Sequence, residues 1–138
     1  MAENMGAANT TVLMLVTLAL SGCGLTGPAH GPRSSKAAAA VTMGFESYSP
    51  TTLMIRAGDT IEWQNTSPIT HTVTDNAKLA KKATDSSLPP GASPFNSGDI
   101  SAGQVYFHTF TTPGTYHYFC IHHEQDGMLG TVVVRAAS

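Results

Sequence analysis

The chain has 138 residues, of which 41% are hydrophobic and 12% charged, and its formal net charge is −2. This length fits about one domain, and the lack of excess Lys and Arg excludes a nucleic-acid binder that relies on a basic face to neutralise phosphates. The apolar share and the small net charge also exclude a chain kept disordered by its charge, while 13 glycines and 8 prolines imply many turns between short strands.

Residues 1–22 have the pattern of an export signal. The apolar run over 10–20 has the length of a signal-peptide hydrophobic region and falls short of the roughly 18–20 apolar residues of a membrane-spanning helix. The residues before it contain Glu3 and no Lys or Arg, whereas such signals usually begin with positive charge; translation from Met5 would remove Glu3. We predict that the protein is exported.

The end of this segment, Leu20-Ser21-Gly22-Cys23, resembles a bacterial lipoprotein signal, in which the chain is cut before the cysteine and the sulfur receives a diacylglyceryl group. The resemblance implies a periplasmic or cell-surface protein, held to a membrane by a lipid on Cys23. The alternative is an ordinary secretory signal with an unrelated cysteine. Residues 23–38, rich in Gly, Pro, Ser and Ala, predict a flexible tether to a folded domain over 39–138.

The rest of the chain carries the alternation of apolar and polar residues that is typical of half-buried strands. Leu53 and Ile55 precede the turn residues 56–59, and Ile61 and Trp63 follow them, which predicts a pair of antiparallel strands. The other predicted elements are strands over 41–45 and 71–75, a surface loop with one helical turn over 76–98, and strands over 105–110, 115–120 and 130–135. About seven to eight short strands without an amphipathic helix predict an all-β sandwich or barrel.

Sulfur and nitrogen ligands occur together in one short segment near the C-terminus. Cys120, His123 and Met128 follow the spacing Cys-x2-His-x4-Met, and His122 adjoins His123, so that either imidazole could serve. A soft thiolate with an imidazole and a weak thioether suits copper, above all Cu(I), and suits hard ions poorly. A trigonal copper site needs a second imidazole, for which His71, at the start of a predicted strand, is the candidate.

The full pattern is similar to that of the blue (type 1) copper proteins, the cupredoxins, with a loop spacing closest to plastocyanin and pseudoazurin. It consists of Asn65, then His71 six residues later, then Tyr116-x-Tyr118-x-Cys120-x2-His123-x4-Met128-x-Gly130. The resemblance covers most of residues 41–135 and implies a Greek-key β-sandwich with one copper ion near one end.

The resemblance also assigns roles to individual residues. It implies that His71, Cys120 and His123 are the three strong ligands and that Met128 is the long axial ligand, and its spacing selects His123 over His122. Asn65 matches the residue that ties the two ligand loops together in related proteins. Thr70 and Thr72 flank the first histidine where relatives often have Pro and Asn, so the hydrogen bonds around this ligand are expected to differ.

The remaining histidines are not assigned to the metal. His108 shares the parity of apolar residues in its strand and is expected to be half-buried, His117 is expected to face water, and His30 lies in the tether. His122 is expected to point to solvent.

The implied function is one-electron transfer between Cu(I) and Cu(II), without an open coordination position for a substrate and hence without enzymatic activity. His123 is the expected exit for the electron, amid the apolar residues Pro68, Ile69, Ile121 and Leu129. The expected partner is a redox protein, such as a c-type cytochrome or a membrane redox complex, and the protein itself is expected to be a monomer. The alternative is a copper store or donor that uses the same residues.

The cysteine count is consistent with this interpretation. If Cys23 carries a lipid, Cys120 is the one thiol that remains, and it is free to bind a metal. The competing possibility is a disulfide between Cys23 and Cys120, which would remove the sulfur ligand and leave a plain sandwich.

Overall fold

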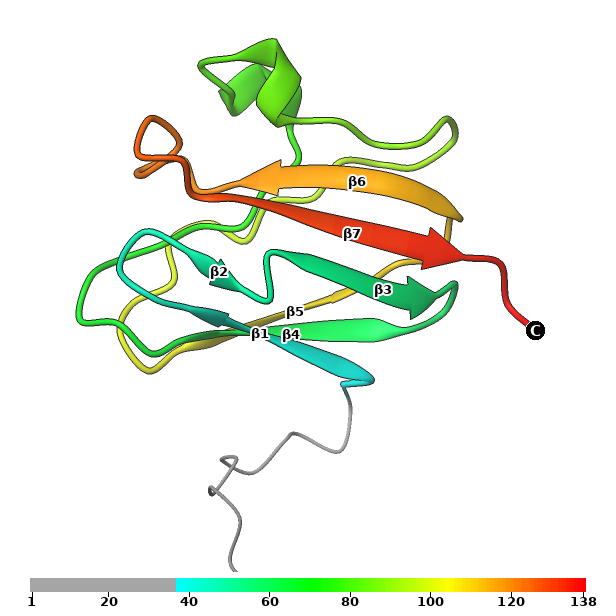
Figure 1. Cartoon of the computed structure of the whole chain (residues 1–138), viewed down its shortest axis with the longest axis horizontal. Coiled ribbons are helices and arrows are strands. Elements are labelled where there is room, and N and C mark those ends of the chain that lie inside the picture. The colour runs from blue at the N-terminus through cyan, green and yellow to red at the C-terminus, as the bar shows by residue number, and fades with distance from the viewer. Residues whose placement is uncertain (1–36) are drawn as a thin grey trace, which may run out of the picture. The chain divides into compact units, whose positions relative to one another are not determined.

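The computed structural model describes residues 37–138, which form two facing sheets (Figure 1). The strands in chain order are β1 (Ala39–Met43), β2 (Tyr48–Ser49), β3 (Thr52–Arg56), β4 (Thr60–Asn65), β5 (Val105–Thr109), β6 (Gly114–Phe119) and β7 (Leu129–Arg135). One sheet has the order β2-β1-β4-β5 and the other β3-β7-β6. The prediction of an all-β sandwich is confirmed. In the described part of the chain, no helix is long and apolar enough to cross a membrane.

The strands on either side of the turn at residues 56–59 lie in different sheets, so the predicted antiparallel pair is wrong. β3 pairs in parallel with β7, whereas β4 pairs in parallel with β1 and antiparallel with β5. At the turn, Ala57 N–H donates to the carbonyl of Arg135 in one sheet and Gly58 N–H to that of Phe110 beside the other. The turn therefore carries the chain across the core. Alternation identified the buried face of each strand, but it does not identify the neighbouring strand.

Residues 71–75 form isolated bridges rather than the predicted regular strand. His71 pairs with Ile100, and Thr74 pairs with both Asn96 and Phe119. The segment from 76 to 98 is a loop, as predicted, with two short turns of 3-10 helix, η1 (Ala77–Leu79) and η2 (Ala83–Asp85). It is more than a surface loop, because its Phe95 side chain is buried in the core.

Aromatic side chains fill the space between the sheets. Trp63 is completely buried, and the rings of Phe95, Tyr106, Phe110 and Tyr118 lie with their centroids 5.7–6.2 Å from it. Rings at these separations and tilts gain attraction beyond the area that they bury. The core thereby fixes β6, which leads directly into the segment with the predicted ligands.

We expect Gly130→Ala to destabilise the fold by about 1–3 kcal/mol, the usual cost of overpacking a core. A Cβ atom at Gly130 would lie 2.2 Å from Cζ of Tyr118, whose ring is held within the core. Urea unfolding of the two proteins measures the difference. Gly44→Ala is the control, because its Cβ would meet only Ser47, with the hydroxyl at 3.1 Å and the carbonyl oxygen at 3.9 Å. Equal losses from both substitutions would contradict the close contact with Tyr118.

Asp75 is a buried carboxylate with only part of its hydrogen-bonding capacity used. Its side chain is 0% exposed, and Oδ1 accepts a bond of 2.8 Å from Phe95 N–H, while Oδ2 has no partner among the described residues. Burial raises the pKa of Asp75 from 3.8 to about 6, because it disfavours the ionised form.

This raised pKa predicts a pH-dependent gain in stability for Asp75→Asn. Because the folded state holds the proton more tightly than the unfolded state, the contribution of Asp75 to stability is fully present below about pH 4 and is lost as the pH rises through about 6. An amide cannot ionise, so we expect the variant to be more stable at pH 8 by about 1–3 kcal/mol and to lose this advantage near pH 4. Urea unfolding at both pH values tests this; a gain of equal size at both would contradict it.

Candidate metal centre

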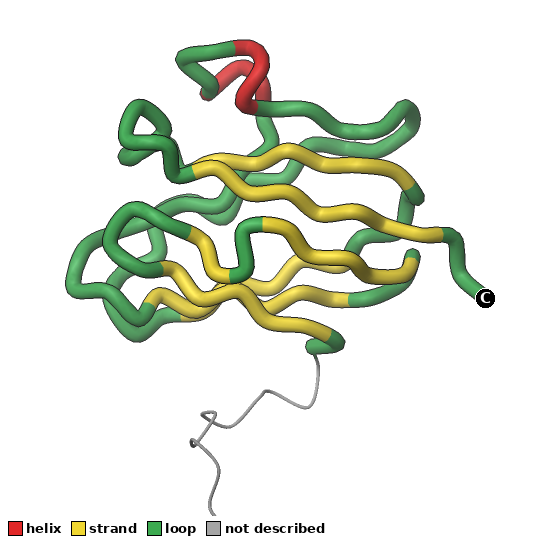
Figure 2. Tube along the Cα trace, in the orientation of Figure 1, coloured by secondary structure: helices red, strands yellow, loops and turns green. Residues whose placement is uncertain are grey.

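The predicted ligands come from two loops at one end of the sandwich. β6 ends at Phe119 and β7 begins at Leu129, so residues 120–128 form the connection between them, drawn as a loop in Figure 2. His71 lies in the segment that follows β4, held by a pair of backbone bonds with Ile100 at 3.1 and 2.8 Å. Segments that are some fifty residues apart in sequence meet here, as the bond of 3.1 Å from Thr74 N–H to the Phe119 carbonyl shows.

Three side chains form a cluster with the size and the chemistry of a copper site. Cys120 Sγ lies 3.5 Å from His123 Nδ1 and 3.8 Å from His71 Nδ1, and the two imidazole centroids are 5.0 Å apart. His71 and Cys120 are fully buried, and His123 is partly exposed. Within residues 37–138 this is the one group of three such side chains whose ligand atoms lie within 4.8 Å of one another. One thiolate with two imidazoles is a donor set that fits copper.

The loop between β6 and β7 folds back on itself, which brings Met128 beside Cys120. Cys120 N–H donates to the Met128 carbonyl at 3.1 Å, and Met128 N–H donates to the His123 carbonyl at 3.0 Å. Gly127 has a φ of +85°, a conformation that side chains rarely adopt and that lets the chain turn back here. Met128 is fully buried. The backbone thus holds the three predicted loop ligands together before any metal binds.

The other histidines lie outside the cluster. His122 is exposed, and its Nε2 lies 2.8 Å from Asp99 Oδ1. His108 is half-buried and stacks on Phe95 at a centroid distance of 4.4 Å, and His117 is exposed and bonds to Thr131, so both occupy the environments predicted for them. His30 lies outside the described residues. Of the adjacent pair, it is His123 that faces the sulfur.

Thr72 makes the connection between the two ligand loops that had been expected of Asn65. Its backbone N–H donates to Cys120 Sγ at 3.3 Å, and its hydroxyl accepts a bond of 2.8 Å from Ile121 N–H. Asn65 instead donates to the carbonyl of Ile69 in the first loop, at 2.7 Å, and to that of Ile100 in the segment before β5, at 2.9 Å.

Glu124 is a further structural residue that the sequence did not identify. Its side chain is only 4% exposed, and its carboxylate accepts bonds of 2.9 Å from Lys81 N–H and 3.0 Å from Lys82 N–H. The carboxylate therefore fastens the loop that carries His123 to the segment between η1 and η2. The sequence shows only that Glu124 directly follows the predicted ligand His123. This position alone does not indicate that the carboxylate is buried.

The environment of His71 favours the neutral imidazole. Burial is the main cause of its lowered pKa, the nearby His123 lowers the pKa further, and a hydrogen bond to the Gly44 backbone opposes the shift. A metal binds only the unprotonated nitrogen of a histidine. The buried ring is therefore ready to bind a metal at neutral pH.

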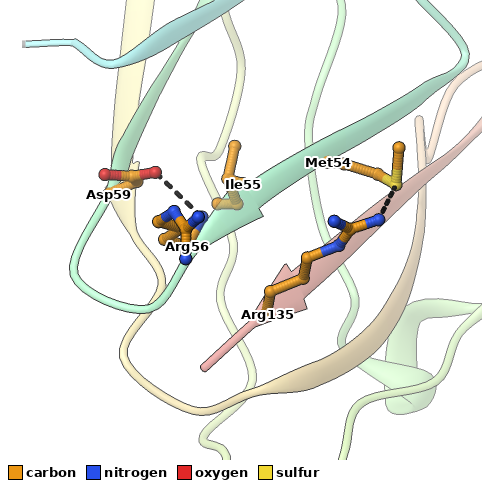
Figure 3. A pocket seen from close by; sticks show the side chains of 5 residues that line it. All are labelled: Met54, Ile55, Arg56, Asp59 and Arg135. Carbon is orange, nitrogen blue, oxygen red and sulfur yellow. Dashed lines mark hydrogen bonds between the residues drawn. The ribbon is translucent and has the colours of Figure 1, made fainter. Parts of the chain in front are cut away.

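A separate pocket lies at the opposite end of β7, away from the ligand loop (Figure 3). It is lined by Met54, Ile55, Arg56, Asp59 and Arg135. Arg56 N–H donates to Asp59 Oδ2 at 2.8 Å, and Arg135 Nη2 lies 3.4 Å from Met54 Sδ. Met54, Arg56 and Arg135 are exposed, and these contacts take no part in the cluster.

Known proteins resemble this chain in both sequence and structure. The family model of copper binding proteins of the plastocyanin/azurin family matches residues 35–135. Plastocyanin of Prochlorothrix hollandica is 33% identical over 105 residues, which cover 73% of this chain and 76% of that protein. Chloroplastic plastocyanin of Tetradesmus obliquus is 31% identical over 102 residues, covering 71% and 68%. The Cu(I) form of an amicyanin variant superposes with a TM-score of 0.58 at 28% identity, covering 75% of this chain and 86% of that one.

Two facing sheets with a His–Cys–His cluster at one end define a cupredoxin, a protein that transfers electrons through a type 1 copper centre. The chain belongs to the plastocyanin/azurin family of copper-binding proteins. Its cofactor is a single copper ion.

Proposed function

We propose that His71, Cys120 and His123 are the strong copper ligands, that Met128 is the axial ligand, and that the protein is an electron carrier rather than an enzyme. The observation that carries this proposal is that the Nδ1 atoms of both histidines lie within 3.8 Å of the one sulfur. When bound, copper supplies the one-electron couple between Cu(I) and Cu(II).

The chain's own residues contribute rigidity and the exclusion of water. His71, Cys120 and Met128 are fully buried, so water is kept from the face of the site that they form. The backbone bonds within the loop and the bond from Thr72 N–H to the sulfur hold these side chains in place from both loops. Little movement is then needed when the charge at the site changes, which favours fast electron transfer.

His123 is the proposed exit for the electron. It is the partly exposed member of the cluster, and Ile69, Ile121 and Leu129, which lie close in sequence to the ligands, are also partly exposed. A small apolar surface around one imidazole suits a brief contact with another protein. The proposed partner is a redox protein, such as a c-type cytochrome or a membrane redox complex.

Copper loading tests the function directly. Addition of Cu(II) to the purified protein should give an intense blue band from sulfur-to-copper charge transfer, and voltammetry should give a reversible one-electron wave. A pale product that quickly loses its copper to a chelator would favour the alternative, a copper store or donor.

Proteins of this plastocyanin-like kind are typically exported, and we further propose that this one is tethered to a membrane. The signal over 1–22, the lipid on Cys23 and the tether over 23–38 rest on the sequence alone and lie outside the described residues. Among residues 37–138, Cys120 has no cysteine partner. Mass spectrometry of the mature protein should find a diacylglyceryl adduct on Cys23; a mass lowered by two hydrogens, without metal, would instead indicate a Cys23–Cys120 disulfide.

A further inference from the structure

A serine hydroxyl lies directly behind the first predicted copper ligand. Ser67 is 5% exposed, and its Oγ lies 2.9 Å from Nε2 of His71, the ring nitrogen that is remote from the sulfur. The same oxygen lies 2.8 Å from Asn65 Oδ1 and 3.2 Å from the Ile69 carbonyl. The backbone N–H of Ile69 also donates to this oxygen, at 3.3 Å. The other three groups compete for the one hydrogen that the hydroxyl can donate.

The neighbouring amide determines where that hydrogen goes. Both hydrogens of Asn65 Nδ2 are used, because this nitrogen donates to the carbonyls of Ile69 and Ile100. Asn65 Oδ1 therefore faces Ser67, and it accepts the backbone N–H of Ser67 at 2.9 Å as well as the hydroxyl. The Ile69 carbonyl is the other group that could receive the hydrogen of the Ser67 hydroxyl, and it too can only accept. With either acceptor, the Ser67 hydrogen points away from His71.

The oxygen of Ser67 is then left to accept a hydrogen from the imidazole. That hydrogen must sit on Nε2 of His71, which leaves the lone pair on Nδ1, the atom that lies 3.8 Å from Cys120 Sγ. In a neutral imidazole one nitrogen is a donor and the other an acceptor. A hydrogen-bond partner of one nitrogen therefore fixes the role of the other nitrogen.

We propose that Ser67 is a positioning residue of the copper site, which holds His71 in the tautomer that presents the Nδ1 lone pair to the metal. The proposal rests on the assignment of His71 as a ligand. Without the hydroxyl, part of the protein would carry its hydrogen on Nδ1, where it blocks metal binding. Loss of an outer partner of a metal-binding histidine costs roughly 10–100-fold in metal affinity in other proteins.

The unaltered protein provides the first test, because its metal-free form reports the tautomer directly. In nitrogen-15 NMR of the apo protein at neutral pH, His71 should appear as a neutral ring with a hydrogen on Nε2 and none on Nδ1. A hydrogen on Nδ1, or an even mixture of the two tautomers, would overturn the proposal without recourse to any variant.

Substitutions then test the role of the hydroxyl. We expect Ser67→Ala to shift His71 toward a mixture of tautomers and to weaken Cu(I) binding by roughly 10–100-fold, measured by competition with a chromogenic chelator. Ser67→Thr keeps the hydroxyl and should retain both the tautomer and most of the affinity. Ser86→Ala is the matched control, because Ser86 is equally buried, at 6% exposed, and donates to the Asp75 carbonyl.

The outcomes separate this proposal from the proposed function. If Ser67→Ala changes the tautomer and the affinity no more than Ser86→Ala does, Ser67 has no positioning role. The Gly44 backbone, which also bonds to His71, would then be enough to hold the tautomer. If instead the unaltered protein fails to give a blue copper complex, the ligand assignment is at fault, whatever the tautomer.

Discussion

Cys120→Ser is expected to abolish the blue colour of the copper-loaded protein and its reversible one-electron wave. The colour arises from charge transfer from the sulfur to copper, and a serine oxygen at this position is a harder ligand that stays protonated at neutral pH. Cys120 is fully buried, with both imidazole Nδ1 atoms within 3.8 Å of its sulfur, so no other thiol among residues 37–138 can replace it. Absorption spectroscopy and voltammetry after addition of Cu(II) measure the loss.

Two further measurements complete this test. Cys23→Ser, which changes the chain's other cysteine, should leave the colour of the copper-loaded protein unchanged. Circular dichroism should show that Cys120→Ser keeps its β structure, because this substitution replaces one sulfur atom by oxygen and changes the side-chain volume little. A blue Cys120→Ser variant would exclude Cys120 as the sulfur ligand and with it the proposed site.

His123→Gly is expected to leave a protein that still binds copper but transfers electrons far more slowly. His71, Cys120 and Met128 remain in place, while removal of the partly exposed imidazole opens the site to solvent. Loss of a residue that only hydrogen-bonds to a metal ligand lowers activity by roughly 10–100-fold. The loss in transfer rate should be larger here, because a proposed ligand and the proposed exit are removed together. Stopped-flow oxidation by a c-type cytochrome, with and without added imidazole, measures the rate and its rescue.

The adjacent histidine offers a matched control. His122 is exposed and bonds to Asp99, so His122→Gly should remove a ring of the same kind without opening the cluster. Its transfer rate should stay close to that of the unaltered protein. Equal rates for His123→Gly and the unaltered protein, without added imidazole, would show that the electron leaves by another path.

Local patterns were enough to predict the class of fold and the residues that meet at one end of it. Alternation in β4 and in β5–β7 marked the strands, and the spacing from Cys120 to Met128 placed three potential ligands in one loop. His71 was the candidate for the second imidazole from its place at the start of a predicted strand, and the family resemblance then implied its role as a ligand. The structure brings His71, Cys120 and His123 together, while the role of Met128 as a ligand remains a prediction.

What the sequence did not predict depends on contacts between distant segments. The partner of β3 is β7, and nothing in residues 52–65 distinguishes that pairing from a simple hairpin. The bonds from Thr72 and Ser67 to the ligands, and from Glu124 to the segment before η2, likewise follow from loops that meet in space. Serine, threonine and glutamate are common in exposed loops, so their presence alone did not indicate buried positions.

The strand that pairs with β3 also supports the metal site. β3 lies at the edge of its sheet and has β7, the last strand of the chain, as its one neighbour in the described sheets, with Thr52 opposite Thr131. Pairings between such distant residues slow folding, because closing a long loop costs entropy before the contacts are gained. The connection that holds Cys120 and Met128 is also secured only once β7 has joined β6. The ligand loop is therefore held in place only in a chain whose β7 has paired with both neighbours, so any change that loosens β7 should also loosen the copper site.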